Sequence, residues 1–134
     1  MQHDDVTLTW RTEIAEHELV ALTAAHGGAA AAGWWDRVRP RSLGWVAGRT
    51  PDGALVAFVN VAWDGADHAF LIDTKTHPDQ QHRGLGTAVV QLAVEATRSA
   101  GCEWLFVDYG ADLVPFYEGA CGFTPTHAGL IRLR

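Results

Sequence analysis

The stretch Phe70–Gly101, FLIDTKTHPDQQHRGLGTAVVQLAVEATRSAG, decides how this chain folds. It begins as an apolar strand, passes through a polar loop that ends in Gly84-Leu85-Gly86, and continues with apolar residues at helical spacing. Gly101 is typical of the residue that follows such a helix. A second apolar run, Trp104–Val107, comes next. Strand, helix and strand over this length predict a βαβ unit with parallel strands and a right-handed crossover.

The loop before the helix, Gln81–Gly86, has the composition of an anion-binding site. The N–H groups of a first helical turn have no partners within the helix, and the helix dipole adds partial positive charge there. Glycines let a bulky anion approach this backbone, and Arg83 adds a full positive charge. The loop therefore predicts a phosphate cradle, although its spacing is neither the dinucleotide pattern GxGxxG nor a P-loop.

Two motifs in this order resemble those of the GNAT superfamily of acyl-CoA-dependent N-acetyltransferases. The loop Gln81–Gly86 matches the pattern Q/R-x-x-G-x-G/A, and Phe116-Tyr117-Glu118 with Cys121-Gly122-Phe123 resembles the family's FYE-x-x-GF segment. The resemblance covers His68–Phe123. It implies an enzyme that moves an acetyl group from acetyl-CoA, the acyl-donor cosubstrate, to an amine acceptor, with no metal.

The resemblance also places residues of this chain in the cofactor site. Pantetheine is expected to pair with the strand edge before the loop, where a backbone N–H would stabilise the oxyanion, and the pyrophosphate is expected to bind the loop itself. By position, the cofactor-binding residues are Thr74, Lys75, Thr76, Gln81, His82, Arg83, Gly84, Leu85, Gly86 and Thr87.

Tyr117 falls on the family's general-acid tyrosine. A phenol stays protonated at neutral pH, because its ordinary pKa is about 10, and it can therefore protonate a departing thiolate. The alternative for Tyr117 is an aromatic residue that only packs on the core.

The residues themselves leave the general base open. Asp73 and Asp108 lie near the ends of the two central strands, where open sheets place their chemistry. Asp73 and Lys75 are two residues apart, which predicts that they share a face, and an ion pair there would make Asp73 a poorer base. His77 and a relayed water molecule are the alternatives.

Trp34 and Trp35 follow a low-complexity alanine segment, Ala29–Ala32, that predicts a short or mobile helix. In the resembling family, the segment between the first and second strands helps to build the acceptor pocket. Trp34 and Trp35 are therefore expected to line a substrate site. The alternative is that one of the two rings packs on the core.

The fold class that follows is α/β (α+β), a mixed and largely antiparallel sheet around a central parallel βαβ unit, with helices on both faces. Tight turns such as Thr50–Gly53 join successive strands into a meander. Strands are predicted at Val6–Trp10, Ser42–Arg49, Ala54–Trp63, His68–Thr76, from Phe123 onward, and as a last edge at Leu130–Leu133. Helices are predicted from about Glu13 to Ala25, with Thr12 as the cap, and at Leu113–Ala120.

Length and charge limit the function classes. With 134 residues the chain predicts one domain, residues 1–134, and its 48% hydrophobic content predicts a globular core. A formal net charge of −6 argues against a nucleic-acid-binding surface. The acidic N-terminus is not a secretory signal, no apolar run is long enough to span a membrane, and the two cysteines have no metal or disulfide spacing. These features predict a cytoplasmic protein.

Two functional hypotheses remain at this point. The first is an N-acetyltransferase that acts on a small-molecule amine, and Tyr117 favours it. The second is a non-catalytic acyl-CoA-binding sensor or interaction module, favoured by the lack of an obvious base. The sequence is compatible with a homodimer.

Overall fold

One six-stranded mixed sheet forms the centre of the computed structural model, which describes all residues from Met1 to Arg134. The strands lie in chain order across the sheet: β1 (Gln2–His3), β2 (Val6–Trp10), β3 (Ser42–Arg49), β4 (Leu55–Trp63), β5 (His68–Thr76) and β6 (Trp104–Val107). Neighbours pair antiparallel except β5 and β6, which are parallel. The predicted mixed sheet and its parallel βαβ unit are therefore confirmed, but the unit lies at the edge of the sheet and not at its centre, because no further strand pairs with β6.

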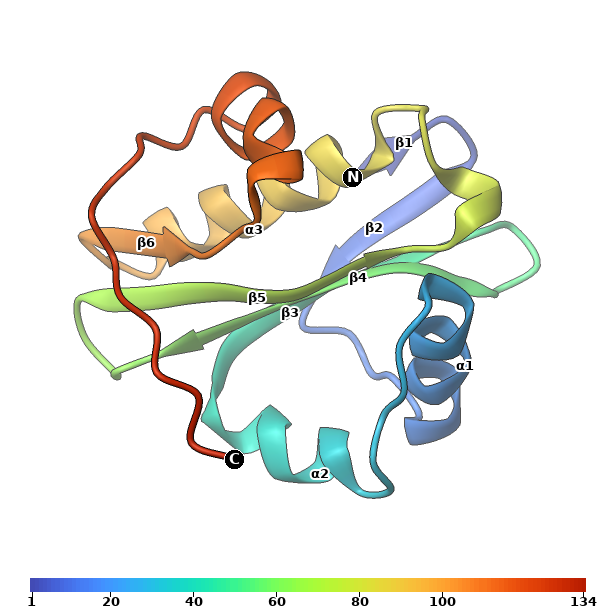
Figure 1. The fold of residues 1–134 in the computed structure, drawn as a ribbon. Helices are drawn as coiled ribbons and strands as arrows, with labels where there is room; N and C mark the ends of the chain where they lie inside the picture. Colours follow the sequence, from blue (N-terminus) through green and yellow to red (C-terminus); the bar gives the residue numbers. More distant parts are fainter.

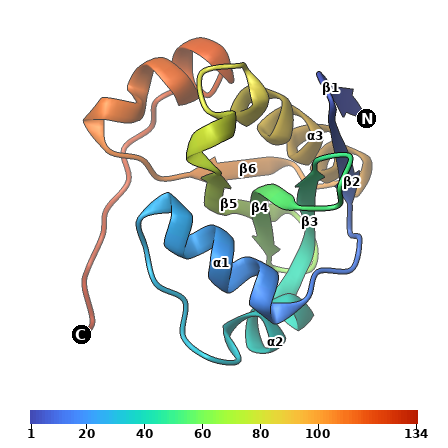
Figure 2. The ribbon, with the colours of Figure 1, turned by 90° about the vertical axis from the view of Figure 1, so that its right-hand side faces the viewer.

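Helices cover both faces of this sheet, as Figures 1 and 2 show. The helices α1 (Glu16–His26) and α2 (Trp34–Val38) lie on one face, and α3 (Leu85–Ser99) and the π-helical turn η4 (Pro115–Ala120) lie on the other. Three 3₁₀ turns complete the helical elements: η1 (Arg39–Arg41), η2 (Pro78–Gln80) and η3 (Ala111–Leu113). None of these helices combines the length and the apolar character that crossing a bilayer requires.

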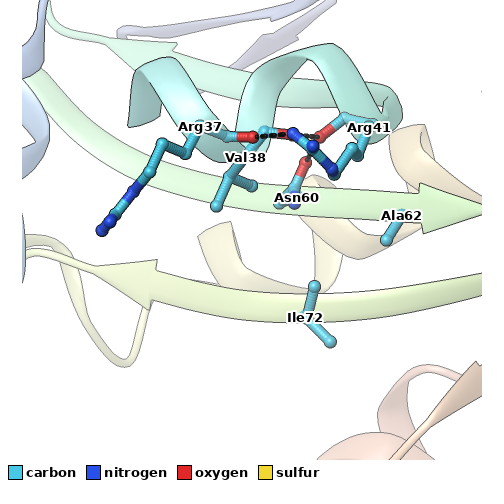
Figure 3. Close-up of a pocket in the computed structure, with 7 residues that line it drawn as sticks. Arg37, Val38, Arg41, Asn60, Ala62 and Ile72 are labelled. Carbon is cyan, nitrogen blue, oxygen red and sulfur yellow. Dashed lines mark hydrogen bonds between the residues drawn. The ribbon is translucent and has the colours of Figure 1, made fainter. Parts of the chain in front are cut away.

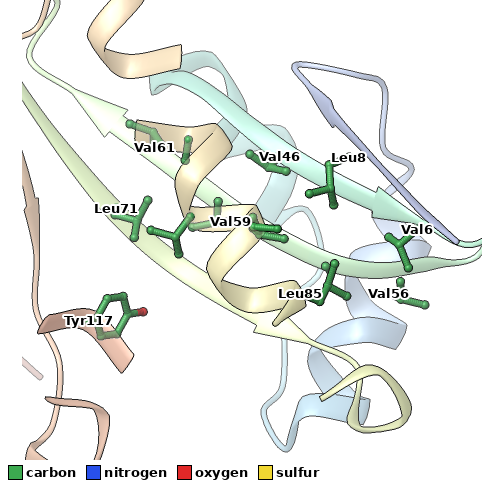
Figure 4. Close-up of a cluster of buried hydrophobic side chains, with 14 of the residues drawn as sticks. Val6, Leu8, Val46, Val56, Val59, Val61, Leu71, Leu85 and Tyr117 are labelled. Atoms are coloured by element: carbon green, nitrogen blue, oxygen red, sulfur yellow. The ribbon is translucent and has the colours of Figure 1, made fainter. Parts of the chain in front are cut away.

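The sheet separates two hydrophobic cores because β3 and β4 are buried on both faces. Figure 4 shows the larger core, in which Val46, Val59 and Leu71 of the sheet face the α3 side together with Leu85. The smaller core lies under α1 and α2 and is built around aromatic rings. Its members are Ile14, Leu19, Leu22, Trp35, Trp45, Ala47, Leu55 and Phe58.

The first helix begins three residues later than its pattern predicted. Thr12 does not cap it, because the N-cap residue is Ala15, and Thr12 instead accepts a hydrogen bond from the Trp45 indole on its carbonyl at 2.7 Å. Instead the Ala15 N–H donates to the Glu18 carboxylate at 2.9 Å. The same carboxylate pairs with Arg49 of β3 at 2.6 Å, and these hydrogen bonds lower the pKa of Glu18 to about 2. One acid thus joins the start of α1 to the sheet. The Ala29–Ala32 segment, by contrast, forms no helix.

The predicted C-terminal strand is wrong. Phe123 donates its N–H to the Tyr117 carbonyl, and after this bond the residues from Thr124 to Arg134 form no helix or strand. In Figure 1 this segment runs past the end of β6 without joining the sheet. Leu130 and Ile131 are 86% and 82% exposed, so the apolar pattern that predicted a strand has no partner within this chain.

Candidate functional site

The start of α3 presents free backbone donors at the end of the predicted loop. Gly84 is the N-terminal cap, with a φ of 78° that favours glycine, and no side chain caps the helix. The N–H groups of Leu85, Gly86 and Thr87 therefore have no acceptor within the helix. Arg83 is exposed beside them and forms no ion pair. This arrangement can bind a phosphate group.

Contacts from two strands hold this loop in place. The Gln81 side-chain amide donates to the carbonyl of Thr76, at the end of β5, at 3.2 Å. On the other side, His3 of β1 lies 2.7 Å from the Arg83 carbonyl, so its Nε2 must carry the proton and donate. His82 adopts a positive φ of 64° between these two ties. The loop is thus ordered before any ligand binds, which lowers the entropic cost of binding.

Gly86 has a packing role that the sequence did not reveal. A Cβ built at this position would lie 3.3 Å from the Phe116 ring. Because the ring belongs to η4, the glycine lets η4 approach the first turn of α3. This contact brings the second predicted motif, which contains Tyr117, beside the loop.

The parallel pairing of β5 and β6 stops halfway along β5. Leu71 pairs with Val107, and β5 then continues to Thr76 with no partner on that side. Figure 1 shows the chain rising from β6 toward η4 while β5 runs on. The predicted pantetheine-pairing segment, Thr74–Thr76, lies beyond this break, where one edge of its backbone has no neighbouring strand.

Tyr117 lies at the same break and is only 6% exposed. Its hydroxyl donates to Thr74 Oγ1 at 3.3 Å, and its ring stacks on Tyr109 with centroids 5.0 Å apart. Burial raises the pKa of Tyr117 above its ordinary value of 10.0, and the nearby Asp108 charge acts in the same direction. The phenol is therefore a protonated donor at neutral pH, held next to the strand that is predicted to bind pantetheine.

Asp73 lies in a β-bulge of β5 and adopts a positive φ of 60°. The bulge interrupts the alternation of side chains along β5. Asp73 and Lys75 were predicted to share a face, but they form no ion pair, since no nitrogen–oxygen contact within 4.0 Å joins them. Asp73 is exposed, yet the protein atoms around its carboxylate partly desolvate it and raise its pKa, and the weaker attraction of Lys75 acts the other way. A raised pKa makes Asp73 a stronger base than the predicted ion pair would allow.

The other two candidate bases are placed less favourably. Asp108 is exposed in the loop after β6, on the Tyr117 side. His77 uses its Nδ1 to accept the Asp79 N–H at 3.1 Å, which occupies one ring nitrogen in the turn η2. Neither residue lies on the strand segment opposite Tyr117.

The two tryptophans have different environments. Trp35 is 2% exposed and packs edge-on against Trp45 and Phe58. Trp35 is therefore the ring that packs on the core, as the alternative prediction had it. Trp34 is half-buried, and the Lys75 ammonium lies 5.2 Å from its ring centre. Trp34 therefore faces the part of β5 beyond the break, where a substrate would be expected.

Sequence reasoning missed a pocket of about 460 Å³ on the α2 side of the sheet. Figure 3 shows α2 and η1 above the strands that carry Asn60 and Ile72; Arg41 folds back toward the Arg37 carbonyl, and the Arg37 side chain extends away from Asn60. One signal was present in the sequence, since Asn60 is the single polar residue within the apolar run Ala54–Trp63. No three His, Cys, Asp or Glu side chains of the chain come together in a way that could hold a metal ion.

The sequence matches the family model described as "Acetyltransferase (GNAT) family" over residues 8–123, which is most of the chain. A search of curated proteins finds no match.

Solved structures of low sequence identity share the fold. An acetyltransferase from Trypanosoma brucei has a TM-score of 0.80 at 23% identity, with 97% of this chain and 99% of that chain covered. Glucosamine-6-phosphate N-acetyltransferase from Arabidopsis thaliana has a TM-score of 0.74 at 16% identity, with 94% and 97% covered. Ribosomal-protein-alanine N-acetyltransferase from Brucella melitensis has a TM-score of 0.73 at 18% identity, with 96% and 99% covered.

Proposed function

Because this chain belongs to the acetyltransferase (GNAT) family, we propose that it is an N-acetyltransferase that moves the acetyl group of acetyl-CoA to the amine of a small molecule. Membership of the family supports acyl transfer in general. The observation that supports this specific reaction is the meeting of three features at one break in the sheet: the free amides of α3, the unpaired edge of β5 and the buried phenol of Tyr117.

In this proposal the residues of the loop and of β5 hold the cosubstrate. The amides of Leu85, Gly86 and Thr87, together with Arg83, bind the pyrophosphate. The backbone of Thr74–Thr76 pairs with the pantetheine arm, and an N–H of this segment faces the thioester oxygen as negative charge develops on it.

The acceptor amine must lose a proton before it attacks the thioester carbon. Asp73 is the proposed base, because desolvation raises its pKa and it lies beside the segment that would hold the thioester. The attack forms the carbon–nitrogen bond and a tetrahedral oxyanion. The carbon–sulfur bond then breaks and Tyr117 donates its proton to the thiolate. The nitrogen, which is still protonated after the attack, releases its extra proton to the Tyr117 phenolate, and the products are CoA and the amide.

The fold neighbours do not identify the acceptor for this chain. The names of two of them specify different amines, an amino-sugar phosphate and the alanine of a ribosomal protein. A small molecule is favoured here because the pocket of about 460 Å³ is of the size that such ligands occupy. The proposal also places the enzyme in the cytoplasm, where acetyl-CoA is available.

A homodimer is part of the proposal. Phe70, Trp104 and Phe106 lie on the face of β5 and β6 opposite α3, and between 38% and 56% of each is exposed. Rings of this set stack on one another, with Phe70 and Phe106 centred 5.3 Å apart. An exposed apolar patch next to a free strand edge favours association with a second copy.

Release of free thiol from acetyl-CoA across a panel of small amines tests the reaction. We expect thiol release that depends on an amine and an acetylated product that mass spectrometry identifies. If acetyl-CoA binds but no amine of a broad panel accelerates thiol release, the alternative of a non-catalytic acyl-CoA-binding module is supported instead.

A further inference from the structure

The pocket on the α2 side of the sheet has the features of a binding site for an anionic group. It is formed where α2 and η1 cross β4 and β5, and Figure 3 shows its residues. The residues that matter for its chemistry are Arg37, Arg41, Ser42, Asn60 and Ile72.

Asn60 places an unsatisfied donor among these residues. The side chain is fully buried, and in the orientation shown its Oδ1 accepts the Ser42 hydroxyl at 2.6 Å. Its Nδ2 has no hydrogen-bond partner. A buried N–H group without an acceptor is costly, so an acceptor oxygen supplied by a ligand would remove a penalty that the free protein carries.

Two arginines without a carboxylate partner border the pocket. Arg37 and Arg41 are exposed, and no carboxylate lies within ion-pair distance of either. Arg41 Nη1 donates to the Arg37 carbonyl at 2.8 Å, which fixes the position of its guanidinium and leaves its remaining N–H groups free. In a chain with a net charge of −6, this pair is a local exception. A guanidinium fork matches the two oxygens of a carboxylate or phosphate.

The pocket adjoins the proposed reaction centre along β5. Asn60 of β4 lies opposite Ile72 of β5 in the antiparallel pair. Ile72 directly follows Leu71, which is the last residue of β5 that pairs with β6. The next residue is Asp73 in the bulge. A ligand in the pocket would therefore have one end under the arginines and the other next to the break in the sheet.

We propose that the acceptor is an amine that also carries a carboxylate or phosphate group, which Arg37 and Arg41 bind while the Asn60 amide donates to the same ligand. This inference rests on the proposed acetyl transfer for the role of the ligand, but the anion site itself does not need turnover. Positive charge at the pocket also disfavours purely cationic amines, because like charges repel in a partly desolvated site.

Three amines of similar length test the inference: propylamine, β-alanine and O-phosphoethanolamine. We expect kcat/KM to be at least tenfold higher for one of the two anionic amines than for propylamine. In the double variant Arg37→Gln, Arg41→Gln, this ratio should fall by about 10- to 100-fold, the range for loss of hydrogen bonds to a charged group. The matched control is Arg39→Gln, since Arg39 belongs to the same turn but does not line the pocket, and it should keep the ratio.

Calorimetric binding of the same amines separates failure of this inference from failure of the proposed reaction. If no amine is acetylated, binding of an anionic amine that is weakened in the double variant and not in Arg39→Gln still supports the anion site. The inference is overturned if propylamine is the best acceptor and ligand, if neither anionic amine binds at millimolar concentration, or if the double variant behaves like the control. A preference for β-alanine or for O-phosphoethanolamine identifies the anionic group as a carboxylate or a phosphate.

Discussion

Tyr117 lies among three aromatic rings, those of Tyr109, Phe116 and Phe123, with its hydroxyl directed to Thr74. The substitution Tyr117→Phe keeps these ring contacts and removes one hydrogen bond, so the free energy of unfolding should fall by about 1 kcal/mol or less. If the phenol protonates the thiolate, kcat should fall about 10²- to 10⁴-fold.

The pH dependence of this defect is the sharper measurement. A thiol has a pKa near 8.5, so thiolate can leave without a proton donor at alkaline pH, and the defect should shrink as the pH rises. Rates of thiol release between about pH 6 and pH 9.5 check this. A variant that folds and keeps the wild-type kcat over this range would show that Tyr117 only packs.

Asp73 combines a left-handed backbone with a carboxylate of raised pKa. The substitution Asp73→Asn suits both features, because asparagine tolerates positive φ and cannot act as a base. We expect acetyl transfer to fall about 10²- to 10⁴-fold. In the wild type, activity should decline as the pH falls through the raised pKa, and the residual activity of the variant should lack this decline.

The same shift predicts a change in stability. Because the folded-state pKa lies above the ordinary value of 3.8, the folded protein holds this proton more tightly than the unfolded chain. The contribution of the protonated Asp73 carboxyl to the free energy of unfolding is present below pH 3.8, and it is lost as the pH rises through the folded-state pKa. The Tm of Asp73→Asn relative to wild type should therefore be higher at pH 7 than at pH 3, and an equal difference at both pH values would contradict the assignment.

At the scale of the element, both ends of α3 carry a glycine with positive φ. Gly84 precedes the helix with a φ of 78°, and Gly101 follows it with a φ of 90°. Substitution by valine at either position imposes a similar backbone strain, about 1–2 kcal/mol. Only Gly84 borders the free amides that are proposed to bind the pyrophosphate.

The pair of variants Gly84→Val and Gly101→Val therefore separates strain from binding. We expect acetyl-CoA affinity to fall at least tenfold in Gly84→Val, because the side chain obstructs the approach of the phosphates. Gly101→Val should bind with wild-type affinity in isothermal titration calorimetry. If the two variants bind acetyl-CoA with equal affinity, the start of α3 is not the phosphate-binding site.

At the scale of the whole molecule, the sheet ends in an open edge at β6 with an apolar face beside it. The C-terminal segment is also apolar and unpaired. We therefore expect the protein to sediment as a homodimer at micromolar concentrations. Phe106→Glu should shift it to a monomer, since the side chain is 38% exposed in the patch and a charge there would have to be desolvated on association.

Val20→Glu is the matched control, because Val20 is 39% exposed on α1, outside the patch. Analytical ultracentrifugation of the two variants checks the prediction. A wild-type protein that remains monomeric over this concentration range, or a Phe106→Glu variant that remains dimeric, would show that this face does not associate.

The sequence by itself determined the parts of the fold that local patterns encode. Helical spacing after Gly84, the apolar run of β4 and the turn at Thr50–Gly53 each predicted an element that the structure contains. The loop was predicted as a phosphate site because free helical amides have the same chemistry wherever they occur, and the Tyr117 segment was predicted as part of the site because its motif resembles that of the GNAT family.

Only the tertiary structure decided the features that depend on distant partners. Trp34 and Trp35 are adjacent in the chain, but contacts with Trp45 and Phe58 place the second ring in the core. The bulge at Asp73 cancels an alternation that strand periodicity had predicted.

The pocket and the C-terminal segment depend on distant partners in the same way. Arg37, Arg41 and Asn60 come from three elements. The two arginines and the unsatisfied Asn60 amide line one pocket only when α2 and η1 pack on the sheet. The segment Leu130–Leu133 has the composition of a strand but no adjacent edge in this chain to pair with. A strand needs a neighbour for its N–H and C=O groups, and that neighbour is set by the packing of the whole molecule rather than by local sequence.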